Sequence, residues 1–250
     1  NSNVRKGIGV EFDAKENIIK NNVVSGFRRN IDGLSSDTAI VHNNISENGI
    51  ERGITINALT GMRNNIIAKN EIGLVYPTVT SSDYNLYWHN NTNTTDQLSE
   101  HDIVADPMFV NDTIPVYGGT YDYHLQKYSP AIDAGDPTIL DVDGSRSDIG
   151  MFGGPGGEKY TYKDLAPREP RNLSALVDTN YITLKWNRNT EADTSFYKVY
   201  RDTVISFQID STKLISSQTD TFFIQTNPHN ISKYVYKVTC VDNQGNESSP

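Results

Sequence analysis

The sequence is short of several features that mark common protein classes. It has one cysteine, Cys240, so an internal disulfide framework is excluded. No apolar run approaches the roughly 18 residues that a membrane-spanning helix needs. Lys and Arg number 22 against 31 Asp and Glu, which gives a net charge of −9, and they form no basic run. The acidic balance therefore argues against nucleic acid and anionic membranes as partners.

Motifs of the common enzyme families are missing as well. The chain has no Gly-x-Ser-x-Gly, no phosphate-binding loop and no dinucleotide fingerprint. Its five histidines are scattered, without the short spacing of metal ligands. The apolar pattern of a helix (i, i+3, i+4, i+7) is not sustained over any stretch of about 10–12 residues. The signals that remain are those of β-strands.

What the sequence does have is an internal repeat of about 21 residues. Three repeats carry an asparagine pair and the fourth carries a single asparagine: Asn21-Asn22, Asn43-Asn44, Asn64-Asn65 and Asn85. A glycine followed by an apolar residue keeps the same pace: Gly9-Val10, Gly33-Leu34, Gly53-Ile54 and Gly73-Leu74. Two series that run together over four repeats predict stacked units with a shared core.

Each repeat predicts one coil of a parallel β-helix. Apolar residues alternate over short stretches, which is strand periodicity. Asparagine suits the turns because it tolerates left-handed geometry and its amide can bond to the coils above and below. We expect two columns, a stack of Asn22, Asn44 and Asn65 and an inward stack of Val10, Leu34, Ile54 and Leu74. Over about residues 1–90 the pattern resembles the right-handed parallel β-helix repeats of the pectate-lyase-like superfamily.

A second recognisable stretch covers residues 106–152. Its runs at 129–136, Ser-Pro-Ala-Ile-Asp-Ala-Gly-Asp, and at 141–152 resemble the C-terminal segment of many bacterial surface β-helix proteins. The resemblance implies a cap over the open end of the last coil, where strand edges would otherwise be exposed. The expected plug residues are Phe109, Leu125, Ile132, Ile149 and Phe152. Arg146 is expected to pair with an aspartate of the cap loop.

The remainder of the chain has the pattern of a β-sandwich. Glycines at 153–157 and prolines at 167 and 170 predict a linker over 153–169, between a β-helix domain at 1–152 and a second domain at 170–250. The second domain closely resembles a fibronectin type III domain, with Trp186 as its core tryptophan and Tyr234 as its tyrosine corner. Cys240 is expected in its core. Residues 247–250 begin the seventh strand without completing it. The predicted fold class is all-β.

The coil surface offers one group of candidate catalytic residues. With the glycines as anchor, Glu11, Asp13 and Asp37 lie close together on neighbouring coils. A glycoside hydrolase needs two or three carboxylates on one face, and a lyase needs calcium-binding acids with a basic residue. The alternative is structural, because aspartate is favoured where a strand enters a turn.

Two further groups are candidates for binding. Aromatic residues in the last repeat could line a sugar-binding surface or simply pack: Tyr84, Tyr87, Trp88 and His89. Asp141 and Asp143 precede a glycine and, with Asp148, could direct carboxylates at one calcium ion. The alternative for these aspartates is an ion pair with Arg146.

Together these features predict a secreted or cell-surface bacterial protein with a binding or structural role, related to carbohydrate. The alternative is an extracellular polysaccharide lyase or glycoside hydrolase. The expected partner is a polysaccharide or another surface component. Because both ends look cut from a longer protein, a second protein chain is also expected there.

Overall fold

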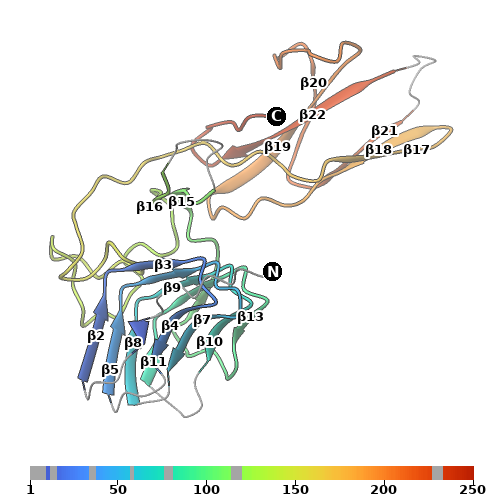
Figure 1. The fold of residues 1–250 in the computed structure, drawn as a ribbon. Coiled ribbons are helices and arrows are strands. Elements are labelled where there is room, and N and C mark those ends of the chain that lie inside the picture. Colours follow the sequence, from blue (N-terminus) through green and yellow to red (C-terminus); the bar gives the residue numbers. More distant parts are fainter. Residues whose placement is uncertain are drawn as a thin grey trace. The chain divides into compact units, whose positions relative to one another are not determined.

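The computed structural model describes residues 10–11, 16–33, 38–56, 59–75, 81–113, 120–226 and 233–250. These residues form strands, turns and loops, with no helix among them, and the predicted all-β class is confirmed. Within the same ranges no helix is long and apolar enough to cross a membrane. Chain contacts divide the protein into two units, Asn1–Lys163 and Asp164–Pro250, and each is described by itself (Figure 1).

The first unit is a parallel β-helix, since its successive strands pair in parallel with strands about one repeat away (Figure 1). Sheet A runs in the order β1 (Val10–Glu11), β4 (Arg29–Gly33), β7 (Arg52–Ile56), β10 (Ile72–Val75), β13 (Thr92–Thr94). Sheet B runs in the order β2 (Glu16–Lys20), β5 (Thr38–His42), β8 (Leu59–Arg63), β11 (Ser81–Asp83). Sheet C runs in the order β3 (Val23–Ser25), β6 (Ile45–Glu47), β9 (Ile66–Ala68), β12 (Leu86–Trp88), β14 (Ile103–Val104).

The register of sheet A corrects the predicted inward column. Ile31, not Leu34, stands between Val10 and Ile54, while Leu74 follows Ile54 as expected. Gly33 pairs with Ile56, so the glycines at 33 and 53 are not equivalent. The reason is unequal coil length, with steps of 21, 23 and 20 residues along this column. Ile31, Ile54 and Leu74 are almost fully buried in the core.

The predicted asparagine stack is confirmed at the corner between sheets B and C. The backbone N–H of Asn44 donates to Asn65 Oδ1 at 3.1 Å, and that of Asn65 donates to Asn85 Oδ1 at 3.0 Å. Asn22 bonds to Asn44 in the same way at 3.1 Å. Each side-chain amide therefore holds the coil beside it, which replaces water for backbone groups buried at the turn.

Residues 106–113 and 120–163, which we call the lateral segment, lie along sheet C. They include the antiparallel strands β15 (Phe109–Asn111) and β16 (Asp122–Leu125) (Figure 1). Strand alternation turns Ile67 into the β-helix core and its neighbour Ile66 outward, against Phe109, Leu125 and Ile149. A cap over the end of the last coil was expected, and the segment instead contacts successive coils along the side of the stack, through Asn21, Asn43 and Asn64.

The predicted plug residues divide within this segment. Phe109, Leu125 and Ile149 are buried, whereas Ile132 and Phe152 are half-buried against the same cluster.

The first asparagine of each pair fastens the lateral segment. Asn21, Asn43 and Asn64 have left-handed φ angles of 57°, 54° and 59°. Asn21 Nδ2 donates to the carbonyls of Met151 and Gly153 at 2.7 and 2.8 Å. Asn43 Nδ2 donates to Asp148 O at 3.0 Å, and Asn64 Oδ1 accepts the N–H of Asp136 at 2.7 Å. Three successive coils thus hold one segment.

The glycine run at 153–157, expected as a flexible linker, belongs to this contact. A Cβ on Gly153 would lie 2.9 Å from Asn43 Nδ2, and one on Gly156 would lie 2.6 Å from Asn21 Oδ1. Glycine is needed because the backbone approaches the coil corners closely. The first unit accordingly extends to Lys163.

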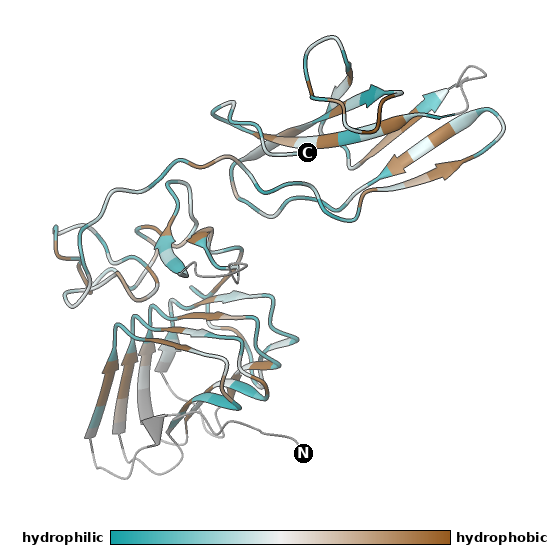
Figure 2. Ribbon diagram, turned by 45° about the horizontal axis from the view of Figure 1, so that its top comes forward, coloured by the Kyte–Doolittle hydropathy of each residue, from teal (hydrophilic) through white to brown (hydrophobic). Residues whose placement is uncertain are grey.

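The second unit is a sandwich of two antiparallel sheets. One sheet has the order β17 (Ser174–Val177), β18 (Tyr181–Lys185), β21 (Phe222–Thr226). The other has the order β20 (Leu214–Gln218), β19 (Thr194–Asp202), β22 (Val235–Asp242). Figure 2 shows both hydrophobic and hydrophilic residues on the strands of this unit, and β18 alternates, with Ile182 and Leu184 buried between exposed Tyr181 and Lys185.

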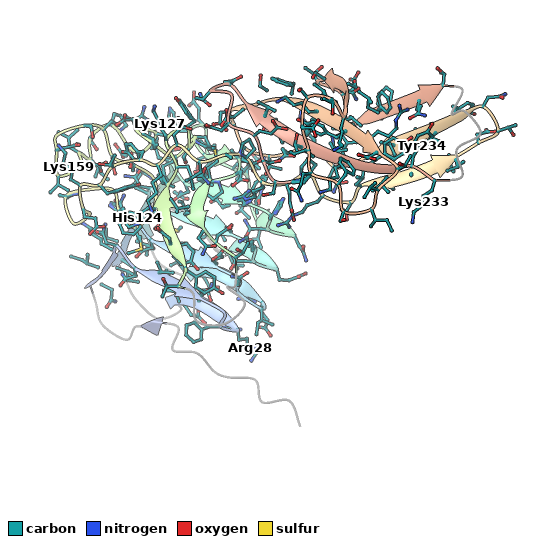
Figure 3. All side chains as sticks on the ribbon, turned by 90° about the horizontal axis from the view of Figure 1, so that it is seen from above. Arg28, His124, Lys127, Lys159, Lys233 and Tyr234 are labelled. Atoms are coloured by element: carbon teal, nitrogen blue, oxygen red, sulfur yellow. The ribbon has the colours of Figure 1, made fainter. Side chains whose placement is uncertain are left out.

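Its core confirms two predictions and changes a third. Trp186 and Cys240 are buried as expected. The Tyr234 ring, labelled in Figure 3, lies under the guanidinium of Arg201, with 4.7 Å between the guanidinium carbon and the ring centroid. The tyrosine hydroxyl that accepts an upstream backbone N–H is instead that of Tyr197, which accepts from Asn189 at 2.8 Å.

The residues after β22 turn back onto it. The N–H of Ser248 donates to Cys240 O at 2.9 Å, and Ser248 Oγ accepts the N–H of Cys240 at the same distance. The neighbouring Glu247 accepts from the Lys198 ammonium at 2.7 Å.

Candidate ligand-binding site

The corner between sheets C and A repeats the backbone design of the B–C corner. Asn48, Lys69 and His89 occupy the left-handed position, with φ angles of 56°, 54° and 49°. The next residues form a second ladder, in which the N–H of Gly49 donates to Asn70 Oδ1 at 2.7 Å and that of Asn70 donates to Asn90 Oδ1 at 3.0 Å. Arg28, labelled in Figure 3, lies at this corner in the first coil.

Sequence reasoning missed this second ladder because its signal is interrupted. Asn70 and Asn90 are spaced like the first series, but Phe27 and Gly49 stand at the equivalent places in the earlier coils. Asn30 substitutes for the absent side chain, since its Nδ2 donates to Asn70 Oδ1 at 3.3 Å.

A surface hollow of about 530 Å³ lies over the C–A corner. Its lining comes from neighbouring coils: Asn48, Gly49, Ile50, Lys69, Asn70, Glu71, His89 and Asn91. Asn48, Glu71, His89 and Asn91 are exposed, and Asn91 Nδ2 donates to Glu71 Oε2 at 2.5 Å. Ile50 adds an apolar side chain that is 62% exposed. The hollow therefore offers amide and carboxylate groups beside an apolar surface.

One lining residue, Lys69, belongs to an ion-pair network. Lys69 Nζ lies 2.7 Å from Glu47 Oε1 and 2.8 Å from Asp112 Oδ2. Burial disfavours the charged ammonium, but the hydrogen bonds to Asp112 and Glu47 outweigh it and raise the pKa of Lys69. Glu47 is fully buried and also accepts the Tyr123 hydroxyl at 2.8 Å. Burial, together with the Glu47 carboxylate, raises the pKa of Tyr123, so the hydroxyl stays a donor.

The four predicted ligand-binding residues do not share one surface. His89 lines the hollow, and its ring is stacked on Trp88 at 3.9 Å. Trp88 is half-buried against the lateral segment. Tyr87 is wrong as a surface residue, because strand alternation turns it into the β-helix core, where it is 1% exposed. Tyr84 lies at the B–C corner between His101, stacked at 4.4 Å, and Arg146, at 5.6 Å.

The predicted catalytic residues fall largely outside the described part of the chain. Asp13 and Asp37 lie outside the described residues, and Glu11 is described by its backbone alone. The register pairs Glu11 with Asp32, where the glycine alignment had placed Ser35. Asp32 accepts from Arg29 Nη1 at 2.8 Å. The acidic neighbour of Glu11 is therefore a residue that sequence alignment on the glycines overlooked.

The three predicted calcium ligands serve as acceptors for the lateral segment. Asp141 accepts the N–H groups of Gly154 and Asp148 at 2.5 and 3.0 Å. Asp143 accepts from Ser145. Asp148 accepts the Asp133 N–H and the Tyr162 hydroxyl, both at 2.9 Å, and burial raises its pKa to about 6.

These three aspartates do not make a formed metal site. Among the described residues no group of three or more His, Cys, Asp or Glu side chains is placed to hold a metal ion. Calcium binding stays a prediction. Arg146, expected to pair with an aspartate, donates instead to the carbonyls of Gly135 and Ala134 at 2.5 and 3.1 Å.

Comparison with known proteins relates only part of the chain to others. No family model matches it. The amylopullulanase of Thermoanaerobacterium saccharolyticum is 36% identical over 83 residues, which is 33% of this chain and 6% of that protein. The amylopullulanase of Thermoanaerobacter thermohydrosulfuricus is 36% identical over 84 residues, or 34% and 5%. The chain thus spans about a twentieth of the length of these curated relatives.

Two solved structures give similar partial matches. An Fn3-like protein from Clostridium thermocellum is 31% identical, with 34% of this chain and 84% of that chain covered and a TM-score of 0.29. The spore cortex lytic enzyme SleM of Clostridium perfringens is 18% identical, with 38% and 29% covered and a TM-score of 0.28. The class of molecule is defined by the strand pairing of its two units, a parallel β-solenoid and a sandwich of two antiparallel sheets.

Proposed function

We propose that the β-helix unit binds an extended polysaccharide in the hollow at its C–A corner. The observation that carries this proposal is the lining of the hollow by equivalent positions of successive coils, Asn48, Lys69 and His89. Paired strands of neighbouring coils lie about 4.8 Å apart, so polar groups recur along the stack at that spacing. A polymer of repeating sugars lying along the stack meets a similar set of groups at each coil.

The chemistry of the lining suits sugar hydroxyls. Asn48 and Asn91 present amides, Glu71 presents a carboxylate, and the Ile50 side chain covers the apolar face of a ring. The names of the two amylopullulanases support a carbohydrate ligand. On this proposal the chain is part of a bacterial protein at or outside the cell surface, with the sandwich as an attached module. Kinship of the β-helix with the pectate-lyase-like superfamily is part of the same proposal.

Affinity electrophoresis through gels with dissolved neutral and acidic polysaccharides tests the binding. The double variant His89→Gly/Asn91→Ala removes two lining side chains, and glycine accepts the left-handed φ of 49° at position 89. We expect the double variant to bind about ten-fold more weakly, which corresponds to about 1.4 kcal/mol. The exposed Asn187→Ala in the second unit is the control and should bind like the wild type.

Two results would contradict the proposal. One is a wild-type protein that none of the polysaccharides retards. The other is that a polysaccharide gel retards both the wild type and the double variant, and the two proteins bind with the same affinity.

The second candidate function is hydrolysis or lyase cleavage of a polysaccharide. Its support is the backbone register of sheet A, which pairs position 11 with Asp32, since Glu and Asp are the residue types that glycoside hydrolysis uses. Assay of the longer parent protein for new chain ends, with and without calcium, tests it. Unchanged activity in the double variant Glu11→Gln/Asp32→Asn would remove these two residues from the reaction.

A further inference from the structure

The charges in and behind the hollow decide what kind of polymer it accepts. Lys69 is the ammonium of the lining, and it already lies within 2.8 Å of two carboxylates, Glu47 and Asp112. An ammonium held in this way does not offer an unpaired positive charge to a ligand. Two arginines of the same corner are also paired, Arg28 with Glu51 at 2.6 Å and Arg29 with Asp32 at 2.8 Å.

Counted together, this group is acidic. The lining holds one ammonium, Lys69, and one carboxylate, Glu71. Glu47 and Asp112 are paired with Lys69, so these four groups carry a net charge of −2, and Arg52 at the start of β7 brings the sum at this corner to −1. The whole chain adds to the effect with a net charge of −9. Like charges within a Debye length, about 8 Å at physiological salt, repel one another appreciably.

We infer that the hollow selects an uncharged polysaccharide and rejects a polyanionic one such as a polyuronate. This inference rests on the proposed function and adds the class of ligand. Glu71 is the specificity-determining residue, because it is the exposed carboxylate of the lining, whereas Glu47 and Asp112 do not line the hollow and are paired with Lys69. Repulsion of this kind separates ligands that have the same backbone and differ in charge alone.

The experiment compares a neutral polymer with its own carboxymethyl derivative. Pullulan with carboxymethyl-pullulan and hydroxyethylcellulose with carboxymethylcellulose are suitable pairs. At low salt we expect the wild type to bind the neutral member about ten-fold more tightly, and the gap should narrow as salt is added. Glu71→Gln should reduce the difference in affinity between the neutral and the carboxymethyl polymer, and Glu71→Lys should abolish or reverse this difference.

The control variants separate local charge from total charge. Glu100→Gln and Glu100→Lys change the net charge of the chain by the same amounts at an exposed residue outside the hollow. They should leave the preference of the wild type intact. Wild-type protein that binds the carboxymethyl member as well as the neutral one overturns the inference. The inference is also overturned if Glu100→Lys reduces the affinity difference between the neutral and the carboxymethyl polymer as much as Glu71→Lys does.

The experiment also separates this inference from the proposed function. Binding that persists with reversed charge preference, and that His89→Gly/Asn91→Ala still weakens, overturns the inference alone. Failure of every polymer to bind overturns the proposed function and the inference with it.

Discussion

The two described corners of the β-helix share one backbone design and differ in what lies over them. At the B–C corner a left-handed residue precedes an asparagine ladder, as with Asn43 before Asn44. At the C–A corner Lys69 precedes Asn70 in the same way. The lateral segment covers the first corner, and the surface hollow lies over the second.

The comparison shows that one position has two uses. At the covered corner Asn21 and Asn43 donate their side-chain amides to backbone carbonyls of residues 148–153, and Asn64 accepts the N–H of Asp136, so these asparagines fasten the lateral segment and act as clasps. At the open corner Asn48, Lys69 and His89 line the hollow; Asn48 and His89 are exposed, and Lys69 is half-buried and paired with Glu47 and Asp112. At both corners the buried ladder asparagine comes one residue after the left-handed residue. The ladder position therefore stabilises the fold, and the residue before it determines the surface chemistry.

Replacing a ladder asparagine is expected to lower the free energy of unfolding more than any other change, and by the same amount at both corners. Asn65 makes four hydrogen bonds, to Val41 O, to Asn85 Oδ1 and from two donors of Asn44. Asn70 is similarly bonded and buried. Asn65→Ala and Asn70→Ala should each lower the free energy of unfolding by about 3 kcal/mol or more.

Urea denaturation measures both variants. The exposed Asn187→Ala serves as the reference, expected within about 0.5 kcal/mol of the wild type. If either variant lowers the free energy of unfolding by less than about 1 kcal/mol, the ladder amides at that corner stabilise the fold little more than hydrogen bonds to water would.

An effect of intermediate size, on the free energy of unfolding, is expected to differ between the two corners when their left-handed asparagines are replaced. Asn43 and Asn48 have φ angles of 54° and 56°, so alanine at either position costs about 1–2 kcal/mol of left-handed strain. Asn43→Ala also loses bonds to Asp148 O at 3.0 Å and Gly150 O at 3.3 Å, whereas Asn48→Ala loses one to Ser25 Oγ. The Asn43 variant should be less stable by about 2 kcal/mol.

Glycine at each position provides the matched control. Asn43→Gly and Asn48→Gly remove the side chain without the strain, so the difference between the corners should persist in denaturation midpoints. Equal costs at the two positions would mean that the clasp to the lateral segment is not stabilising.

The smallest effect is a pH dependence at the covered corner. Burial, with Lys20 and Arg63 nearby, lowers the pKa of His42 to about 4, from about 6.5 in the unfolded chain. The unfolded state therefore binds the proton more readily, and the free energy of unfolding falls as pH drops from about 6.5 to 4. For a half-exposed imidazole we expect about 1–2 kcal/mol.

Comparison with His42→Gln isolates this contribution. Asp148, whose pKa is raised to about 6, acts with the opposite sign over part of the same range, but it is present in both proteins. Unfolding at pH 7 and at pH 4.5 should show the wild type losing more stability than the variant. The same loss in both would assign the acid sensitivity to other groups.

Much of the fold was predictable because it depends on local chemistry repeated along the chain. The second asparagine of each pair sits where a turn leaves backbone groups unpaired, and its amide satisfies them in any stack of coils. The register of sheet A was not predictable, since the coil that contains Ile50 has one extra residue between its strands in sheets C and A, and Gly33 pairs with Ile56 rather than with a glycine. Tyr87 was misplaced for a related reason, because a short apolar run does not say which face is buried.

The candidate site was predictable only in part. His89 was singled out from its aromatic neighbours, yet the hollow it lines depends on Asn48, Glu71 and Asn91, which come from different repeats and carry no motif. Glu47 reads as an ordinary polar residue in the sequence. Its burial is a consequence of Tyr123, 76 residues further along the chain.

By itself the sequence determined that the chain forms a β-helix followed by a sandwich, since asparagine spacing and strand alternation are local properties that every coil or strand expresses alone. The tertiary structure decided which corner is closed. Asn43 and Asn48 have the same residue type and the same backbone conformation, and only the path of the lateral segment along sheet C makes one a clasp and leaves the other to line a hollow.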